Sequence, residues 1–163
     1  MSSPVHCVVD ASVAIKLFIQ QDQSEQAKAL FAQLSTDPRT ELYVPDLFYV
    51  ECANGLWQYV RRANYPAAEA KASLVRLQAL SLQRVAIAEL INEALEREIA
   101  HHISAYDACY VELSNRLQAP LITADHKLIR ALAGTDYQVR NLTMFLPSNS
   151  GDETIAGRKD RCE

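Results

Sequence analysis

Two acidic residues stand just after apolar, strand-like runs at opposite ends of the chain. Asp10 follows the β-branched run at 5–9, and Asp125 follows the run at 121–123 after one alanine. A carboxylate at a strand end can ligate a cation or cap the helix that begins there. In a parallel sheet, ligands bind outside the carboxyl ends of the strands. The pattern therefore predicts that both acids lie at one crevice.

Two further acids lie inside segments with helical periodicity. Residues three and four apart share a helix face, which puts Glu51 beside Leu47 and puts Asp107 beside Ile103 and Tyr110. A charged carboxylate on an apolar face is costly to bury unless a partner compensates it. We therefore expect Glu51 and Asp107 to face a common site.

Each of the four acids also has a purely structural interpretation. Asp10 and Asp125 could cap the helices that follow them. Asp107 forms a capping box with Ser104, and Glu51 could be a solvated helix residue. Taken together, the acids favour a functional site, because carboxylates in one crevice repel one another and a divalent cation removes that repulsion.

Mg²⁺ or Mn²⁺ is the expected cofactor of such a site. These ions prefer oxygen ligands and keep several waters, which leaves room for a phosphate. One or two such ions can support hydrolysis of a phosphodiester bond. Zinc is not expected, because no cysteine pair or Cys/His cluster has zinc spacing. Three of the four cysteines lie in apolar runs and are interpreted as buried free thiols of a cytoplasmic protein: Cys7, Cys52 and Cys109.

Alternating strand-like and helix-like segments must position these residues. Strands are predicted at 5–9, 42–44, 82–87, 121–123 and 137–142. Helices are predicted at 12–19, 23–34, 46–62, 67–80, 88–100, 104–117 and 126–133, with Asp22 as the cap of the second. This alternation predicts an α/β fold, a three-layer α/β/α sandwich with a mainly parallel central sheet.

The length of 163 residues suits one domain, which we expect over 1–146. The polar segment 147–163 has no apolar period and is expected to be a flexible tail. We find no secretory signal and no apolar run of membrane-spanning length, so no membrane partner is expected. The net charge of −4 does not favour nucleic-acid binding by bulk charge, but a local basic groove is compatible with it.

Three segments resemble the motifs of PIN-domain ribonucleases, and most closely those of the VapC toxins of type II toxin–antitoxin systems. The opening motif is VVDASVAIKLF at 8–18, and the helix with the second acid is VPDLFYVECANGLW at 44–57. The closing block is SAYDACYVELSNRLQAPLITADHKL at 104–128. The order of the acids matches the family's acidic quartet, and the resemblance covers about residues 5–142.

The resemblance implies a PIN-like nuclease domain over 1–146 that acts as a Mg²⁺- or Mn²⁺-dependent endoribonuclease on RNA. It also implies a homodimer and a cognate antitoxin that blocks the site. By position, Asp10 and Asp107 would be the main metal ligands. Glu51 would join the metal shell or orient the attacking water, and Asp125 would complete the acidic pocket.

Hydroxyl and basic residues complete the site that the resemblance implies. Ser12 and Thr123 match small hydroxyl positions beside the acids, where they could hold the acids by hydrogen bonds or serve local capping and strand formation. Four basic residues near the motifs could contact RNA phosphates, although a solvated surface charge is the commoner role: Lys16, Arg61, Arg62 and Lys127.

Two other functions are compatible with the pattern. A receiver-like or phosphatase-like protein with a phosphoacceptor aspartate also places acids at strand ends. That class pairs acids near the first strand, whereas Asp10 stands alone there, and a helical Glu51 has no counterpart in it. The other alternative is a non-catalytic scaffold of the same fold that binds RNA or protein, which the complete set of four acids disfavours.

Overall fold

A single sheet of five strands forms the centre of the computed structural model, which describes residues 3–145. The strand order is β3-β2-β1-β4-β5, and every neighbouring pair is parallel. The strands are β1 (His6–Val9), β2 (Glu41–Pro45), β3 (Gln83–Val85), β4 (Leu121–Thr123) and β5 (Val139–Asn141). The predicted α/β fold with a parallel central sheet is confirmed.

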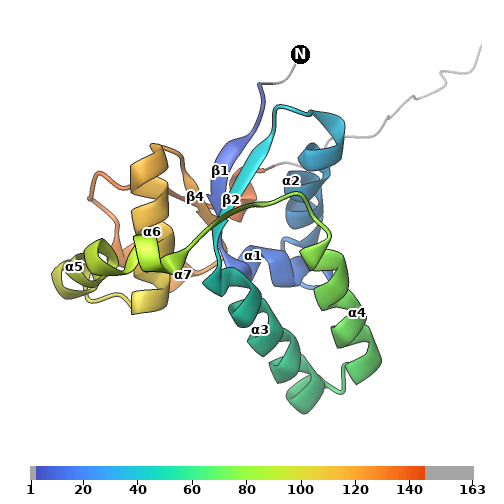
Figure 1. Cartoon of the computed structure of the whole chain (residues 1–163). Helices are drawn as coiled ribbons and strands as arrows, with labels where there is room; N and C mark the ends of the chain where they lie inside the picture. The colour runs from blue at the N-terminus through green and yellow to red at the C-terminus, as the bar shows by residue number, and fades with distance from the viewer. Residues whose placement is uncertain (1–2, 146–163) are drawn as a thin grey trace, which may run out of the picture.

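Helices cover both faces of this sheet (Figure 1). On one side lies α6 with α5 packed against it, and on the other side lie α1 and α2. The hairpin of α3 and α4 extends beyond the carboxyl ends of the strands. The α-helices are α1 (Ala11–Ala14), α2 (Ser24–Thr36), α3 (Leu47–Ala63), α4 (Ala67–Gln78), α5 (Ile91–His101), α6 (Ala105–Leu117) and α7 (His126–Ala131). Short 3₁₀ turns are η1 (Ile15–Leu17), η2 (Ile87–Glu89) and η3 (Leu142–Met144).

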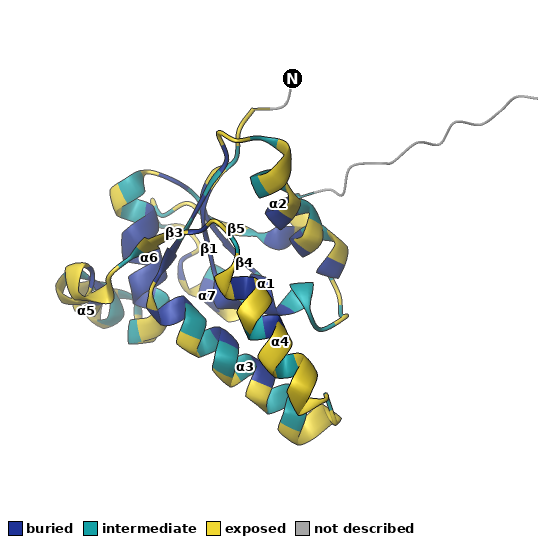
Figure 2. Cartoon of the chain, turned by 45° about the vertical axis from the view of Figure 1, so that its right-hand side comes forward, coloured by how far each residue is buried: buried dark blue, intermediate teal, exposed yellow. Residues whose placement is uncertain are grey.

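The core lies where β1 and β4 meet α6. Val8 and Val9 of β1, and Leu121 and Ile122 of β4, are almost wholly buried, as expected for parallel strands covered on both faces. Seven consecutive residues of α6, at 108–114, are buried as well, so this helix is enclosed rather than half-exposed (Figure 2). The enclosed α6 places Asp107, in its first turn, close to the centre of the sheet.

The predicted cap of the second helix is wrong. Helix α2 begins at Ser24, is preceded by Gln23 in a left-handed conformation (φ 66°), and has no side-chain cap. The hydroxyl of Ser24 instead donates to the carbonyl of Ile19 at 3.2 Å and closes the preceding loop. A serine that bonds the local backbone in this way competes with the capping geometry expected for Asp22.

Two predicted helices are shorter than expected. The segment 12–19 forms only one turn of α1 followed by η1, and the segment at 88–100 begins as η2 and becomes α-helical at Ile91.

Within residues 3–145, no helix combines the length and the apolar character needed to cross a membrane. The three cysteines at 7, 52 and 109 are buried free thiols, as predicted. The predicted tail at 147–163 lies outside the described residues.

Candidate active site

The winding of the chain changes direction across the sheet between β1 and β4. From β1 the chain adds β2 and β3 on one side, and then crosses to place β4 on the other. Such a switch point opens a crevice outside the carboxyl ends of the two strands. Asp10 follows β1 directly, and Asp125 follows β4 after one residue. The charge of Asp125 helps to raise the pKa of Asp10, so the two strand-end acids are close neighbours.

Two hydroxyl groups donate hydrogen bonds to the carboxylate of Asp10. Its Oδ2 accepts hydrogen bonds from Ser12 Oγ at 2.6 Å and from Thr123 Oγ1 at 2.7 Å. Val9 pairs with Ile122 in the sheet, and this register brings Thr123 level with Asp10. Burial raises the pKa of Asp10, which is 6% exposed, and the two hydroxyl bonds offset this only in part. The side chain of Asp10 does not cap α1, so the capping interpretation does not apply to it.

The same two hydroxyls also tie β4 and the following loop to this acid. Ser12 Oγ accepts the backbone N–H of Ala124 at 3.1 Å, and Thr123 Oγ1 accepts that of Asp125 at 3.0 Å. Each hydroxyl therefore donates to Asp10 and accepts from the backbone beside Asp125. Ser12 and Thr123 are therefore both in hydrogen-bond contact with the first acid.

Glu51 projects from α3 and is half-buried rather than solvated. Its Oε1 accepts a hydrogen bond from the hydroxyl of Tyr110 on α6 at 2.7 Å. The pKa of Glu51 is raised to about 7, mainly by burial and also by the nearby charges of Asp10 and Asp107, while the hydrogen bond from Tyr110 has the opposite effect. Tyr110 was missed as a site residue, because the sequence places it on an apolar helix face. The sequence did place Tyr110 three residues after Asp107, on the same helix face, and this spacing could have indicated that Tyr110 lies near the acids.

Asp107 lies in the first turn of α6, and Ser104 caps this helix, which is one half of the predicted capping box. Its Oδ2 accepts a hydrogen bond from Ser104 Oγ at 2.8 Å, while Ser104 Oγ accepts the backbone N–H of Asp107 at 3.1 Å. Burial raises the pKa of Asp107, and the charges of Asp10 and Asp125 add to this effect. Asp107 is therefore both a helix-start acid and a member of the acidic cluster.

Asp125 caps the short helix α7. Its Oδ1 accepts the backbone N–H groups of Lys127 at 2.8 Å and of Leu128 at 3.3 Å. The capping interpretation of this residue is therefore confirmed. Capping uses only Oδ1 of the carboxylate. The charge of Asp125 still acts on Asp10 and Asp107 and helps to raise the pKa of both.

These four acids, Asp10, Glu51, Asp107 and Asp125, form what we call the acidic cluster. Within residues 3–145 no lysine, arginine or histidine forms an ion pair with any of them. In each, one oxygen accepts the hydrogen bonds described above, and the other accepts none from a described side chain. The cluster is therefore an uncompensated set of hard oxygen donors.

Such a donor set fits a divalent cation such as Mg²⁺ or Mn²⁺. In the described part of the chain, no three His, Cys, Asp or Glu side chains are arranged to hold one ion together. Mg²⁺ is usually bound through one or two carboxylates and keeps several waters. The cluster therefore fits an ion that one or two of its carboxylates contact directly, with water completing the shell.

The predicted basic residues lie at different distances from the acidic cluster. Lys127 stands in the first turn of α7, two residues after Asp125. The ammonium group of Lys16 donates to the carbonyl of Asp22 at 2.7 Å and so belongs to the loop before α2. Of the four, Lys127 lies nearest in the sequence to an acid of the cluster.

Arg61 and Arg62 lie in the last turn of α3. They are about 15 Å along the helix axis from Glu51 at 1.5 Å per residue. The guanidinium group of Arg61 lies over the ring of Trp57, 5.9 Å from its centre. Neither arginine therefore lies beside the acidic cluster.

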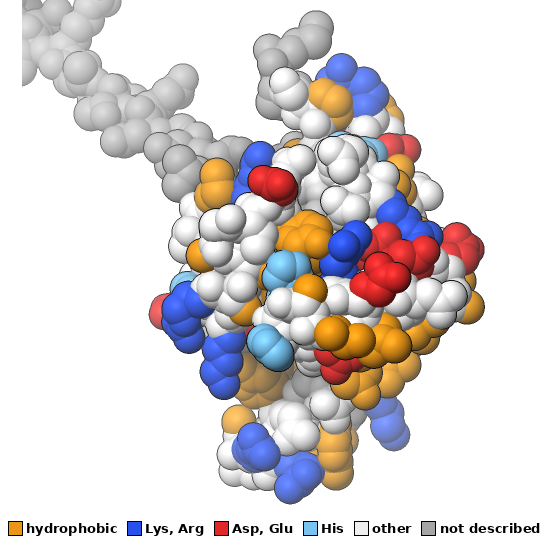
Figure 3. Space-filling model, turned by 90° about the vertical axis from the view of Figure 1, so that its left-hand side faces the viewer, with side chains coloured by type: hydrophobic (Ala, Val, Ile, Leu, Met, Phe, Trp, Pro, Cys, Tyr) orange, Lys and Arg blue, Asp and Glu red, His pale blue; other side chains and the backbone are white. Residues whose placement is uncertain are grey.

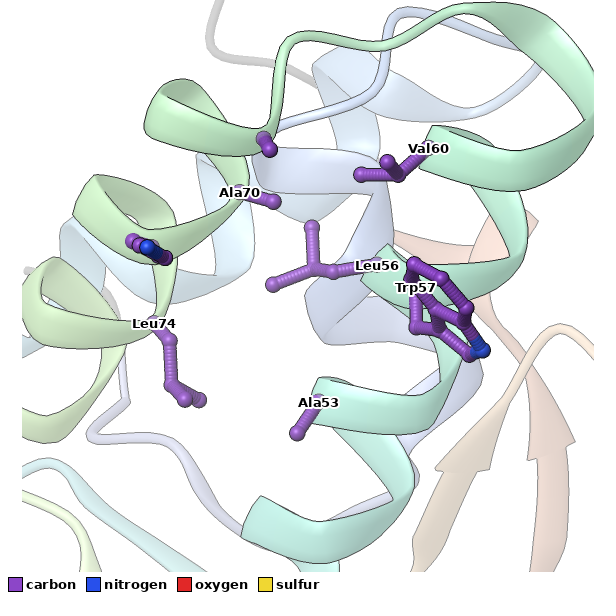
Figure 4. Close-up of a pocket in the computed structure, with 8 residues that line it drawn as sticks. Ala53, Leu56, Trp57, Val60, Ala70 and Leu74 are labelled. Carbon is purple, nitrogen blue, oxygen red and sulfur yellow. The ribbon is translucent and has the colours of Figure 1, made fainter.

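An apolar hollow of about 250 Å³ lies between α3 and α4. Figure 4 shows side chains of both helices around it, among them Leu56 and Val60 of α3, which point toward α4, and Leu74 of α4. Because α3 also carries Glu51, this α3–α4 hollow and the acidic cluster share one helix.

A second apolar surface lies on the outer side of α5. Ile91, Leu95 and Ile99 recur at intervals of four residues and are 43%, 53% and 68% exposed. On this side of the molecule, hydrophobic side chains gather next to acidic and basic ones (Figure 3). We call these three residues the α5 stripe. The inner side of α5 packs on α6, so the stripe is left without a partner within the described chain.

Comparison with known proteins adds three kinds of finding. A model of the PIN domain family matches residues 7–133. Ribonuclease VapC3 of Pyrobaculum aerophilum is 33% identical over 123 residues, which is 74% of this chain and 90% of that protein. Ribonuclease VapC9 of Mycobacterium tuberculosis is 33% identical over 121 residues, which is 74% of this chain and 87% of that protein.

Solved structures share the fold. VapC20 of Mycobacterium tuberculosis, a toxin that cleaves the sarcin-ricin loop, gives a TM-score of 0.59 at 20% identity and covers 77% of this chain and 95% of that chain. A toxin–antitoxin complex from Klebsiella pneumoniae gives 0.57 at 17% identity, with 84% and 98% covered. The family model spans most of the chain, and the curated relatives are matched over most of their own length. This chain therefore belongs to the PIN domain family and, within it, to the VapC proteins.

Proposed function

We propose that this protein is a Mg²⁺- or Mn²⁺-dependent endoribonuclease and the toxin of a toxin–antitoxin pair. The observation that carries the proposal is the acidic cluster, four carboxylates without a cationic partner among the described residues, at the switch point of a PIN-family fold. The curated relatives are ribonucleases, which favours RNA as the substrate. We place the nuclease unit at residues 1–146.

In this proposal each acid has a distinct task. Asp10 and Asp107 contact the ion through the oxygens that their hydroxyl donors leave free. Glu51 joins the shell of the ion or orients the attacking water through Oε2, because Oε1 is occupied by Tyr110. Asp125 completes the negative wall while its Oδ1 caps α7. The ion, when bound, supplies the positive charge that activates water and stabilises the leaving oxygen.

The other predicted residues support these acids. Ser12 and Thr123 keep the carboxylate of Asp10 in one orientation, since both donate to the same oxygen. Lys127 is placed to contact a phosphate next to the cleaved bond. Arg61 and Arg62 would contact RNA phosphates farther along the strand, and Lys16 would do so only after releasing the carbonyl that it now binds.

The nuclease proposal is tested by incubating the purified protein with total RNA and Mg²⁺ or Mn²⁺, with and without EDTA. Asp10→Asn and Asp107→Asn should each lose cleavage, because each removes one charge from the ion site and keeps the shape of the side chain. Asp136→Asn is the matched control, because Asp136 is exposed and lies before the amino end of β5, whereas the acidic cluster lies at the carboxyl ends of the strands. Equal cleavage by all four proteins, or full cleavage in EDTA, would overturn the metal-dependent proposal, and no cleavage by the wild type would favour a non-catalytic scaffold.

We also propose that the antitoxin inserts an apolar segment into the α3–α4 hollow. Solved relatives include toxin–antitoxin complexes, and the hollow is the apolar surface that shares a helix with Glu51. Expression should arrest growth, and co-expression of a neighbouring open reading frame should relieve the arrest. Leu74→Glu should prevent this relief without reducing RNA cleavage. Unchanged relief with Leu74→Glu would place the antitoxin elsewhere.

The α5 stripe supports a homodimer as the solution state. Two copies that pack their stripes against each other would remove these apolar side chains from water. Leu95→Glu should convert the dimer to a monomer in light scattering, whereas Val75→Glu, at an exposed apolar position of α4, should not. A dimer that survives Leu95→Glu would exclude this surface.

We place the protein in the cytoplasm, in keeping with its buried free thiols.

A further inference from the structure

The buried hydroxyl of Tyr110 connects two helices that each carry an acid of the cluster. Tyr110 lies on α6, is 0% exposed, and is one of the largest fully buried side chains. A hydroxyl in such a place needs a hydrogen-bond partner. Among the described residues its hydrogen bond goes to Glu51 Oε1 on α3, at 2.7 Å and 59 residues away in sequence. The tyrosine therefore bridges α6 and α3 at the edge of the acidic cluster.

Filling the core does not explain the hydroxyl. A phenylalanine ring at position 110 would occupy the same space between the sheet and the helices and would bring no polar atom into the interior. The hydroxyl matters only to the group that it touches, which is the carboxylate of Glu51. Asp107 stands three residues earlier on α6, so one helix both supplies an acid and holds a second one.

We propose that Tyr110 is a positioning residue for Glu51. A free glutamate side chain samples several rotamers, and a donor fixed in the core selects one of them. The tyrosine hydroxyl occupies Oε1 and so leaves Oε2 as the oxygen that serves the cation and the attacking water. This inference rests on the proposed function, because it assigns Tyr110 a part in the same site.

Tyr110→Phe tests the hydroxyl alone, since the ring stays in place. Partners that orient metal ligands typically change metal affinity or activity by 10–100-fold when removed. We therefore expect Tyr110→Phe to weaken Mn²⁺ binding about tenfold in EPR titrations without RNA, and to lower kcat by about 10–100-fold with KM for RNA within about twofold. Tyr49→Phe is the matched control, because Tyr49 lies on α3 and its buried hydroxyl has no partner within residues 3–145.

A double-mutant cycle with Glu51→Ala shows whether Tyr110 acts through Glu51. If it does, adding Tyr110→Phe to Glu51→Ala should weaken Mn²⁺ binding by less than about twofold. The inference is overturned if Tyr110→Phe behaves like Tyr49→Phe, or if its loss persists in full without Glu51. Mn²⁺ binding that is absent even in the wild-type protein would overturn the proposed function itself, whereas wild-type binding that Tyr110→Phe leaves unchanged would overturn only the role of Tyr110.

Discussion

The metal-free protein should become more stable when Glu51 is replaced by glutamine. The carboxylate of Glu51 is half-buried next to Asp10 and Asp107, and its pKa is raised to about 7. A raised pKa means that the fold disfavours the ionised form. Glu51→Gln removes the charge and keeps the side-chain length and the oxygen that accepts the bond from Tyr110. The variant should therefore lose repulsion and retain its packing.

The size of the effect follows from the pKa shift. A rise from 4.5 to about 7 corresponds to about 3 kcal/mol for a group fully shielded from solvent. Glu51 is partly exposed, and screening reduces the expected gain to about 1–2 kcal/mol near pH 8. In the wild type, ionised Glu51 lowers the free energy of unfolding. This loss grows as pH rises from about 4.5 to about 7, because the unfolded state releases the proton at a lower pH than the folded state, and above about pH 7 it stays constant. Near pH 5 the gain should be about a quarter of its full value.

Urea unfolding of EDTA-treated protein near pH 8 and near pH 5 measures this gain. Glu96→Gln is the control, because Glu96 is exposed on α5 and forms no ion pair within the described chain. The control should match the wild type at both pH values. A Glu51→Gln protein no more stable than wild type near pH 8, or a gain that does not shrink near pH 5, would refute the electrostatic account of the cluster.

Three further predictions concern the groups around the cluster. Mn²⁺ at a hundred times its Kd should stabilise the wild type by about 2.7 kcal/mol in thermal unfolding, and Asp10→Asn should remove most of this gain. Thr123→Val should cost about 1–2 kcal/mol and weaken Mn²⁺ binding about tenfold, because Asp10 loses a donor and the N–H of Asp125 an acceptor. Glu112→Gln should cost about 2 kcal/mol yet leave Mn²⁺ binding unchanged, since this buried acid pairs Arg97 and Arg116 away from the cluster. Scanning calorimetry measures the change in stability of each variant, and titration calorimetry measures its affinity for Mn²⁺.

Periodicity predicted the parallel α/β fold, and strand ends and helix faces indicated four acids that the structure brings together, for a physical reason. Asp10 and Asp125 could be related because parallel strands end at one edge of a sheet, and that relation depends only on local pattern and chain order. Glu51 stood out because an acid on an apolar helix face needs an explanation. These signals are local, so one sequence contains them.

Contacts between distant segments could not be predicted in the same way. The bond between Tyr110 and Glu51 depends on how α6 packs against α3, and an apolar helix face hides a tyrosine that donates a hydrogen bond. The cap expected at Asp22 failed because Ser24 closes the loop instead, a competition that sequence spacing does not resolve. The exposure of the α5 stripe likewise depends on which side of α5 packs on α6.

The most direct test of the metal site is anomalous diffraction from crystals grown with Mn²⁺. The account predicts a peak beside Asp10 and Asp107, with Glu51 still bonded to Tyr110 and waters completing the coordination shell. The same crystals of Asp10→Asn protein should show the peak lost or much weaker. A well-ordered wild-type structure without a peak at the acidic cluster, or with its manganese bound elsewhere, would contradict the claim that these carboxylates form the catalytic ion site.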